Sequence, residues 1–194
     1  MTSWTSDAFI AGHPVLDFVN TVGDQDKQRE MDLLTDWEVM AHWLKSASLF
    51  TAEQTKAILI DRSEQERDIS LTQLRKLREL TYHALSSSSS GAEPAEALNE
   101  LEALFNTAHA RAHLVLTEHG YQWQPHWQGA NACVDGAVLA IERLLCSPQV
   151  TKVRECQRCT WVFLNTGRGR GRQWCSMKTC GNRAKSASFK QRHR

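Results

Sequence analysis

Four cysteines near the C-terminal end of the chain have the residue type and spacing of a metal site. Cys156, Cys159, Cys175 and Cys180 follow the pattern C-x2-C-x15-C-x4-C. A Cys-x2-Cys turn can present two thiolates to one ion, and a second pair across a loop can complete the tetrahedral four-sulfur shell that structural zinc prefers. The pattern therefore predicts one structural Zn²⁺ with a closed shell and no open position for catalysis.

Two other chemistries also use cysteines at such spacings. An iron–sulfur cluster takes four cysteine thiolates and is the main alternative. A redox-active Cys-x2-Cys pair is the other, and it would leave the second pair of cysteines without a role. The two remaining cysteines, Cys133 and Cys146, lie on different faces of one expected helix. We expect both of them to be buried thiols.

The segment that contains the four cysteines is strongly basic. Residues 151–194 carry twelve Lys and Arg against the single acid Glu155, a formal charge of +11, whereas residues 1–150 carry −10 and the whole chain +1. An acidic body with a basic tail indicates a nucleic-acid contact confined to the tail. The alternatives are a solvated tail, a tail that docks on the acidic body of the same chain, or a basic protein-interaction module that binds an acidic partner.

The basic residues of this segment form two sets that could bind phosphates. Glycines separate Arg168, Arg170 and Arg172, so the backbone can approach closely while the guanidinium groups fork onto phosphates. The second set follows an expected helix and comprises Lys178, Arg183, Lys185, Lys190, Arg192 and Arg194. Six phosphate contacts would give a log–log salt slope of about −5. DNA is the expected target, and RNA is an alternative because Gly-Arg repeats suit sequence-tolerant contacts.

The rest of the chain predicts a mainly α fold. Capping boxes begin at Thr35 and Thr51, and apolar residues recur at helical spacing. The expected helices cover residues 14–22, 35–44, 51–61, 71–85, 97–108 and 134–145. Residues 113–123 predict a small β-hairpin that turns at Gly120. The serine run from Ser86 to Gly91 predicts a flexible loop.

The C-terminal segment predicts a treble-clef-like zinc finger. A knuckle at residues 154–159 leads into a strand at 160–164, a hairpin tip at 167–172 and a basic helix at 182–192. Trp161, Phe163 and Trp174 would form the small core beneath the metal. We expect two domains, residues 1–150 and 151–194. The connection between them is short, so the finger should be docked on the body.

Asp17, Asn20 and Thr21 bring polar groups into an otherwise apolar stretch. At positions i, i+3 and i+4 of a helix they would share one face. One hypothesis is a pocket that senses a small-molecule effector, which needs such groups inside an apolar wall. The other is that they hydrogen-bond the ends of neighbouring helices.

Several function classes find no support in the sequence. No apolar run approaches the roughly 20 residues that span a bilayer, and the N-terminal residues do not form a secretory signal. We expect a cytoplasmic protein without a membrane partner. No nucleophile elbow, phosphate loop or acid–base pair is present, so no enzymatic activity is expected. A small-molecule enzyme with a structural zinc is the least favoured alternative, and a homodimer would suit a palindromic DNA site.

Two motifs resemble a known bacterial family. Residues 174–177, Trp-Cys-Ser-Met, and 180–185, Cys-Gly-Asn-Arg-Ala-Lys, resemble the signature of the CGNR zinc-finger proteins. Residues 12–21, Gly-His-Pro-Val-Leu-Asp-Phe-Val-Asn-Thr, are similar to the opening motif of the helical ABATE domain. In that family the finger follows the ABATE domain, and the pair is described as a candidate stress-induced transcription regulator. The resemblance spans the whole chain and implies the same four zinc ligands.

The chain departs from the family pattern in the finger loop. Relatives usually have an aspartate after the Phe-Leu pair and a serine two residues later, where this chain has Asn165 and Gly167. Gln173 replaces a residue that is commonly basic. The zinc ligands are unaffected. If the aspartate orients an arginine, the loop should be looser here and the DNA contact weaker.

Overall fold

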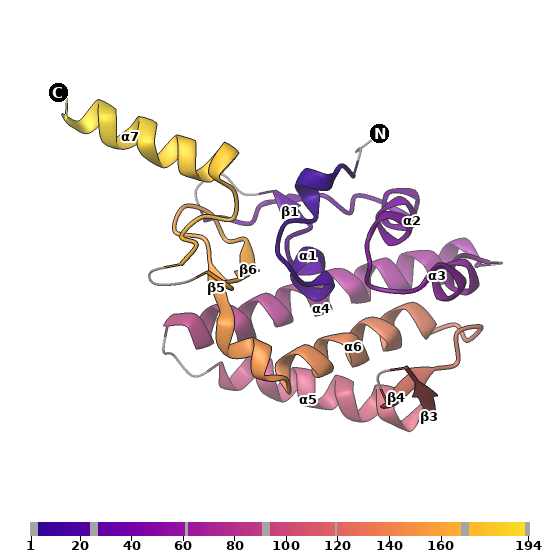
Figure 1. Cartoon of the computed structure of the whole chain (residues 1–194). Coiled ribbons are helices and arrows are strands. Elements are labelled where there is room, and N and C mark those ends of the chain that lie inside the picture. The colour runs from indigo at the N-terminus through magenta and orange to yellow at the C-terminus, as the bar shows by residue number, and fades with distance from the viewer. Residues whose placement is uncertain are drawn as a thin grey trace.

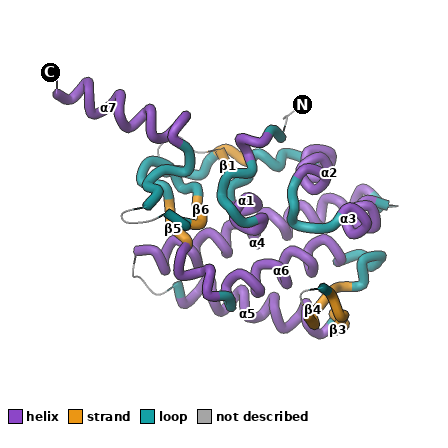
Figure 2. The backbone as a smooth tube through the Cα atoms, viewed as in Figure 1, coloured by secondary structure: helices purple, strands orange, loops and turns teal. Residues whose placement is uncertain are grey.

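The computed structural model describes residues 4–23, 27–60, 62–90, 94–118, 120–167 and 171–192, and it is mainly helical (Figures 1 and 2). Its α-helices are α1 (Pro14–Val19), α2 (Trp37–Ser46), α3 (Ala52–Leu59), α4 (Glu64–Ser90), α5 (Ala95–Ala110), α6 (Ala132–Leu145) and α7 (Asn182–Arg192). Shorter turns are the 3-10 helices η1 (Ser6–Ala8) and η2 (Pro148–Lys152) and the π-helical turn η3 (Met177–Gly181). The strands form three antiparallel pairs, β1 (Val22–Gly23) with β2 (Met31–Asp32), β3 (Ala112–Thr117) with β4 (Gly120–Pro125), and β5 (Val153–Glu155) with β6 (Val162–Leu164).

The centre of the body is a layer of three helices, α4, α5 and α6, which lie side by side (Figure 1). The leucine stripe of α4 contributes Leu71, Leu74 and Leu77, all of them buried. Helix α6 is buried on every side from Ala132 to Ile141. Helices α1 and α2 cover the other side of α4, so one continuous apolar core joins the N-terminal segment to the helical layer.

Local capping interactions fix where two helices begin. Asp36 precedes α2, and its carboxylate accepts a hydrogen bond of 2.8 Å from the Val39 amide. Thr51 and Gln54 form a complete capping box at α3, with each side chain bonded to the other residue's amide. These contacts satisfy amides that have no partner within the helix. The capping box predicted at Thr51 is confirmed, whereas the cap of α2 is Asp36 and not Thr35, one residue later than predicted.

The predicted loop at the serine run is wrong for residues 86–90. Helix α4 continues through Ser90, and Gly91 lies outside the described residues. A serine costs a helix only about 0.5 kcal/mol relative to alanine, and extending an existing helix requires no new nucleation. The Ser86 hydroxyl also donates a hydrogen bond of 2.9 Å to Glu155. That tertiary contact stabilises the extra turn, and the local sequence does not reveal it.

The β3–β4 hairpin is confirmed, and it has an exposed apolar face. Leu114 pairs with Trp123 and Leu116 with Tyr121, and directly paired residues lie on the same face of a sheet. All four side chains are exposed, Tyr121 by 71%.

Within the described part of the chain, no helix has the length and apolar composition needed to cross a membrane.

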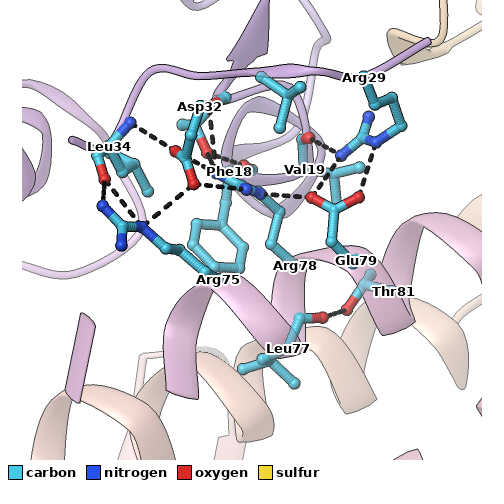
Figure 3. A network of polar contacts seen from close by, with 12 residues as sticks. Phe18, Val19, Arg29, Asp32, Leu34, Arg75, Leu77, Arg78, Glu79 and Thr81 are labelled. Atoms are coloured by element: carbon cyan, nitrogen blue, oxygen red, sulfur yellow. Dashed lines mark hydrogen bonds and ion pairs between the residues drawn. The ribbon is translucent and has the colours of Figure 1, made fainter. Parts of the chain in front are cut away.

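A partly buried network of arginines and carboxylates connects the N-terminal segment to α4 (Figure 3). Arg78 is 4% exposed and lies on the apolar stripe of α4. Its guanidinium donates two hydrogen bonds to the Asp32 carboxylate, of 2.9 and 3.0 Å, and two to Thr21, to the backbone oxygen and to the hydroxyl. Its Nε donates to Glu79 at 2.8 Å. Every donor group of this buried cation therefore has an acceptor.

Two further arginines extend this network to either side. Arg29 pairs with Glu79 through two hydrogen bonds and lies 4.0 Å from the centre of the Tyr82 ring. Arg75 lies 3.1 Å from Asp32 and donates to the backbone oxygens of Leu34 and Thr35. Burial raises the pKa of the Asp32 carboxyl, but hydrogen bonding to Arg78 and its charge outweigh burial, so the pKa is lowered. The network ties the segment after α1 to the middle of α4.

Candidate metal centre

The four cysteine side chains converge at one buried point. All four are buried and free, and their Sγ atoms lie within 4.8 Å of one another. Three Sγ–Sγ separations, Cys159–Cys175, Cys175–Cys180 and Cys180–Cys159, are 3.6, 3.5 and 3.6 Å. Zn–S bonds of about 2.3 Å in a tetrahedron place the sulfur atoms about 3.8 Å apart. The cluster has the size of a single-ion shell and leaves no room for a cluster of several irons.

The thiols of the cluster shift one another's pKa. Hydrogen bonds from Cys159 and then Cys175 lower the pKa of Cys156, whereas hydrogen bonding to Cys156 raises the pKa of both Cys159 and Cys175. Four thiolates at this spacing repel one another unless a cation lies between them. A zinc ion would be held by all four sulfur atoms and would act as a structural cross-link.

Backbone hydrogen bonds position the first two cysteines. The Cys156 amide donates to the Trp161 oxygen at 2.8 Å, which closes the turn that carries Cys156 and Cys159. Strands β5 and β6 extend from this turn with Arg154 paired to Phe163. Phe163 is fully buried and Trp161 and Trp174 are partly buried, so the predicted small core is present.

The other two cysteines connect the hairpin to the basic helix. Cys180 lies in the π-helical turn η3, and α7 begins at Asn182 directly after it. Cys175 precedes this turn. The metal site therefore holds the β5–β6 hairpin and the start of α7 together, as the cysteine spacing predicted.

Helix α7 is exposed and basic. It contains Arg183, Lys185, Lys190 and Arg192 and no acidic residue. None of its residues is buried, and it projects away from the body (Figure 1). Lys178, just before it, is also exposed and lies 3.6 Å from Asp7. Arg168, Arg170 and Arg194 lie outside the described residues.

Arg172 points into the finger, unlike the residues of α7. Its guanidinium lies 4.4 Å from the centre of the Phe163 ring. It donates hydrogen bonds to the backbone oxygens of Trp174, Cys175 and Ile10. These contacts argue against the prediction that Arg172 binds phosphate. They support a structural role, in which Arg172 fastens the chain beside the metal site to the N-terminal segment.

Asn165 holds the base of the finger loop. Its side-chain oxygen accepts hydrogen bonds from the Gly167 and Arg172 amides, at 3.3 and 3.1 Å. Gly171 has φ +64°, and a Cβ there would lie 2.3 Å from the Asn165 side chain, so only glycine fits. The expected loosening of the loop is therefore offset at this point, because the asparagine oxygen accepts both bonds.

The finger is docked on the body through the residues that suggested a pocket. The Asn20 amide donates to the Val162 oxygen at 2.9 Å and accepts from the Val162 amide at 2.8 Å, as a neighbouring strand would. The Asp17 carboxylate accepts from the Ala11 amide, and the Thr21 hydroxyl donates to the Phe18 oxygen. All three side chains are buried, and none lines a described cavity. Their polar atoms serve the fold, which favours the second of the two hypotheses.

The Asn20→Ala variant should lower the free energy of unfolding by about 2–4 kcal/mol, because the buried amide and carbonyl of Val162 would lose their partner. Urea unfolding at neutral pH measures this loss. Asn182→Ala is the matched control, since the exposed Asn182 makes one hydrogen bond to Lys178. Equal losses in the two variants would contradict the role assigned to Asn20.

Asp17 should give the protein a specific pH dependence. Burial raises its pKa from 3.8 to about 6, so the folded protein keeps this proton after the unfolded chain has lost it. Its contribution to stability is complete below pH 3.8 and is lost as the pH rises through about 6. We expect the difference in unfolding free energy between Asp17→Asn and the wild type to change by about 2–3 kcal/mol between pH 4 and 7. A constant difference over that range would contradict this prediction.

The finger's single acid and the two remaining cysteines also lie at defined places. Glu155 accepts hydrogen bonds from Tyr82 and Ser86 and pairs with Lys27 at 2.6 Å, so it anchors the finger to the body. Cys133 is buried, and burial raises the pKa of its thiol to about 12. Cys146 is exposed, so the prediction that it is buried is wrong: it caps the C-terminal end of α6, where the helix leaves the core.

The fold and the site together define a helical body that carries a four-cysteine zinc finger with a protruding basic helix. Comparison with protein families agrees with this description. Residues 12–148 match the ABATE family, described as "putative stress-induced transcription regulator", and residues 152–193 match the CGNR zinc finger. The chain belongs to the ABATE family and ends in a CGNR zinc finger. No curated protein matches it.

Proposed function

We propose that this protein is a DNA-binding transcription regulator whose helix α7 contacts the duplex. The observation that carries the proposal is an exposed helix with four cations, no acid and no buried residue, attached directly to the metal centre. No apolar face of this helix is buried against the body, and its positive charge suits a polyanionic partner.

The positions of the cations on α7 suit a DNA groove. At about 100° per residue, Arg183 and Lys190 form one row, and Lys185 and Arg192 form a second row about 180° away. A helix with its side chains is about 10–12 Å wide, close to the width of the major groove, about 12 Å. A helix lying in the groove would direct each row toward one of the two phosphate backbones.

The metal would act by positioning this helix. Zinc held by Cys175 and Cys180 fixes the chain just before α7, and Arg172 fastens the same segment to the body. Binding should therefore need the loaded finger as well as its charge. The site also requires four reduced thiols, which supports a location in the bacterial cytoplasm.

The test is a salt titration of DNA binding by the zinc-loaded protein, with single-stranded RNA measured in parallel. Four phosphate contacts from α7 predict a log–log slope of about −3.5 on duplex DNA. The double variant Lys185→Gln, Arg192→Gln should reduce the magnitude of the slope by about 2. The double variant Lys56→Gln, Lys76→Gln removes two exposed cations of the body instead and should leave the slope unchanged.

Two outcomes would replace this proposal. Tighter binding to RNA than to duplex DNA would make the finger an RNA-binding module. Absence of binding to both nucleic acids at low salt would favour a protein-interaction or dimerisation module. Loss of self-association in the α7 variant, measured by analytical ultracentrifugation, would then support that alternative.

A further inference from the structure

A cavity of about 940 Å³ lies where the end of α2, helix α3, the β3–β4 hairpin and α6 meet. Small-molecule sites usually measure about 300–1,000 Å³, so it is large enough for an organic ligand. No described residue of the finger lines it. It is also separate from Asp17, Asn20 and Thr21, whose polar atoms serve the fold.

One wall of this cavity is aromatic and held in place. Phe50 and Trp127 pack edge to face with ring centres 5.4 Å apart. Both rings lie directly on α6 at Gly136, where an added Cβ would come within 2.9 Å of Phe50 and 3.0 Å of Trp127. The Trp127 indole donates to Gln124 of the hairpin at 3.1 Å. The two rings, inclined at 67° to each other, form an apolar wall against which another ring can pack.

The charged residues around the cavity are mostly cations. Lys45, Lys56 and Arg143 line it, against the single acid Glu118. Arg143 is exposed at the wall, and its guanidinium forms no hydrogen bond or ion pair with any described residue. The carboxylate of the neighbouring Glu142 lies 2.7 Å from Nε2 of His109. Desolvation by the surrounding protein lowers the pKa of Arg143, and the charge of Glu142 partly counteracts this.

We propose that this cavity binds an organic acid, whose flat apolar part packs against Phe50 and Trp127 and whose anionic group pairs with Arg143. A guanidinium binds a carboxylate through two parallel hydrogen bonds, which gives both affinity and orientation. This site depends on the body alone, so it stands whether or not the finger binds DNA.

The experiment is calorimetric titration of the full-length zinc-loaded protein with 2-naphthylacetate and with its uncharged amide, 2-naphthylacetamide. The two probes share the ring system and differ in charge. We expect the acid to bind about five- to tenfold more tightly than the amide, the gain from one charge-assisted contact at a solvent-accessible site. Arg143→Gln should reduce this ratio to about one to two and leave amide binding nearly unchanged.

Two control variants test whether cations or apolar residues outside the cavity account for probe binding. Lys152→Gln removes an exposed cation that does not line the cavity, and it should keep the full preference for the acid. Leu116→Ser alters an exposed apolar residue of the hairpin that does not line the cavity, and it should keep the affinity for both probes. The proposal is overturned if the wild type binds neither probe or binds both equally. It is also overturned if Lys152→Gln loses the preference, or if Leu116→Ser abolishes binding.

Discussion

Replacement of Cys175 by Ser is expected to remove zinc from the protein and to unfold its finger. The variant keeps three thiolates, but the tetrahedral shell is broken and the ion is open to chelators. Structural zinc contributes an apparent free energy of about 10–16 kcal/mol in isolated fingers, more than any single hydrogen bond in this fold. Metal analysis should show one ion per wild-type chain and close to none in the variant.

The loss of zinc should affect defined parts of the chain. Residues around the site, Val162 and Phe163 among them, are buried in the finger, and their amides should lose protection from hydrogen exchange. Most residues of the hydrophobic core belong to the helical body, so most of the far-UV helical signal should remain. A chelator should produce the same changes in the wild type, and restored zinc should reverse them.

Cys146→Ser provides the control for this experiment. Cys146 is an exposed cysteine outside the cluster, so its replacement should change neither metal content nor protection. A Cys175→Ser variant that still held one zinc ion tightly would contradict the assignment of the four ligands. A wild-type finger that stayed protected after metal removal would contradict the structural role of the ion.

Arg78→Met should give the second large effect, a loss of about 3 kcal/mol in unfolding free energy. The substitution keeps much of the side-chain volume but removes the donors to Asp32, Thr21 and Glu79. Asp32 would lose two charge-assisted hydrogen bonds and the Thr21 oxygens their charged donor, whereas Glu79 would keep its pair with Arg29. Arg75 still pairs with Asp32, which limits the loss.

Urea unfolding of the two single variants, Arg78→Met and Arg75→Met, tests whether burial of the arginine sets the loss in unfolding free energy. The Arg75 side chain is 33% exposed and that of Arg78 5%, so water can replace more of the Arg75 contacts. We expect Arg75→Met to cost less than half as much as Arg78→Met. Equal losses, or a loss below about 1 kcal/mol for Arg78→Met, would show that the network adds little net stability.

The sequence alone determined the features that depend on near neighbours. The spacing of Cys156, Cys159, Cys175 and Cys180 identified the metal site, because turns of fixed length can bring their sulfur atoms together. The capping box at Thr51 located the start of α3 for the same reason, since both partners lie within one turn. The charge of α7 was also readable, because an exposed helix needs no partner to define it.

One feature of the sequence indicated the network of arginines and carboxylates around Arg78. Arg78 lies four residues after Leu74 and three before Thr81, so it belongs to the buried stripe of α4. A charged residue in an apolar stripe predicts a buried partner. It does not say which acid provides that partner, because Asp32 comes from a different segment of the chain.

The tertiary structure decided everything that depends on distant partners. The sequence around Asn20 suits a ligand pocket, yet its side chain hydrogen-bonds Val162. The sequence around Arg172 suits a phosphate contact, yet its guanidinium hydrogen-bonds Ile10. The cavity beside Arg143 is formed by segments from three parts of the chain, and no local pattern marks it. Polar side chains take whichever acceptor the fold places within about 3 Å, and that choice is made only when distant segments pack together.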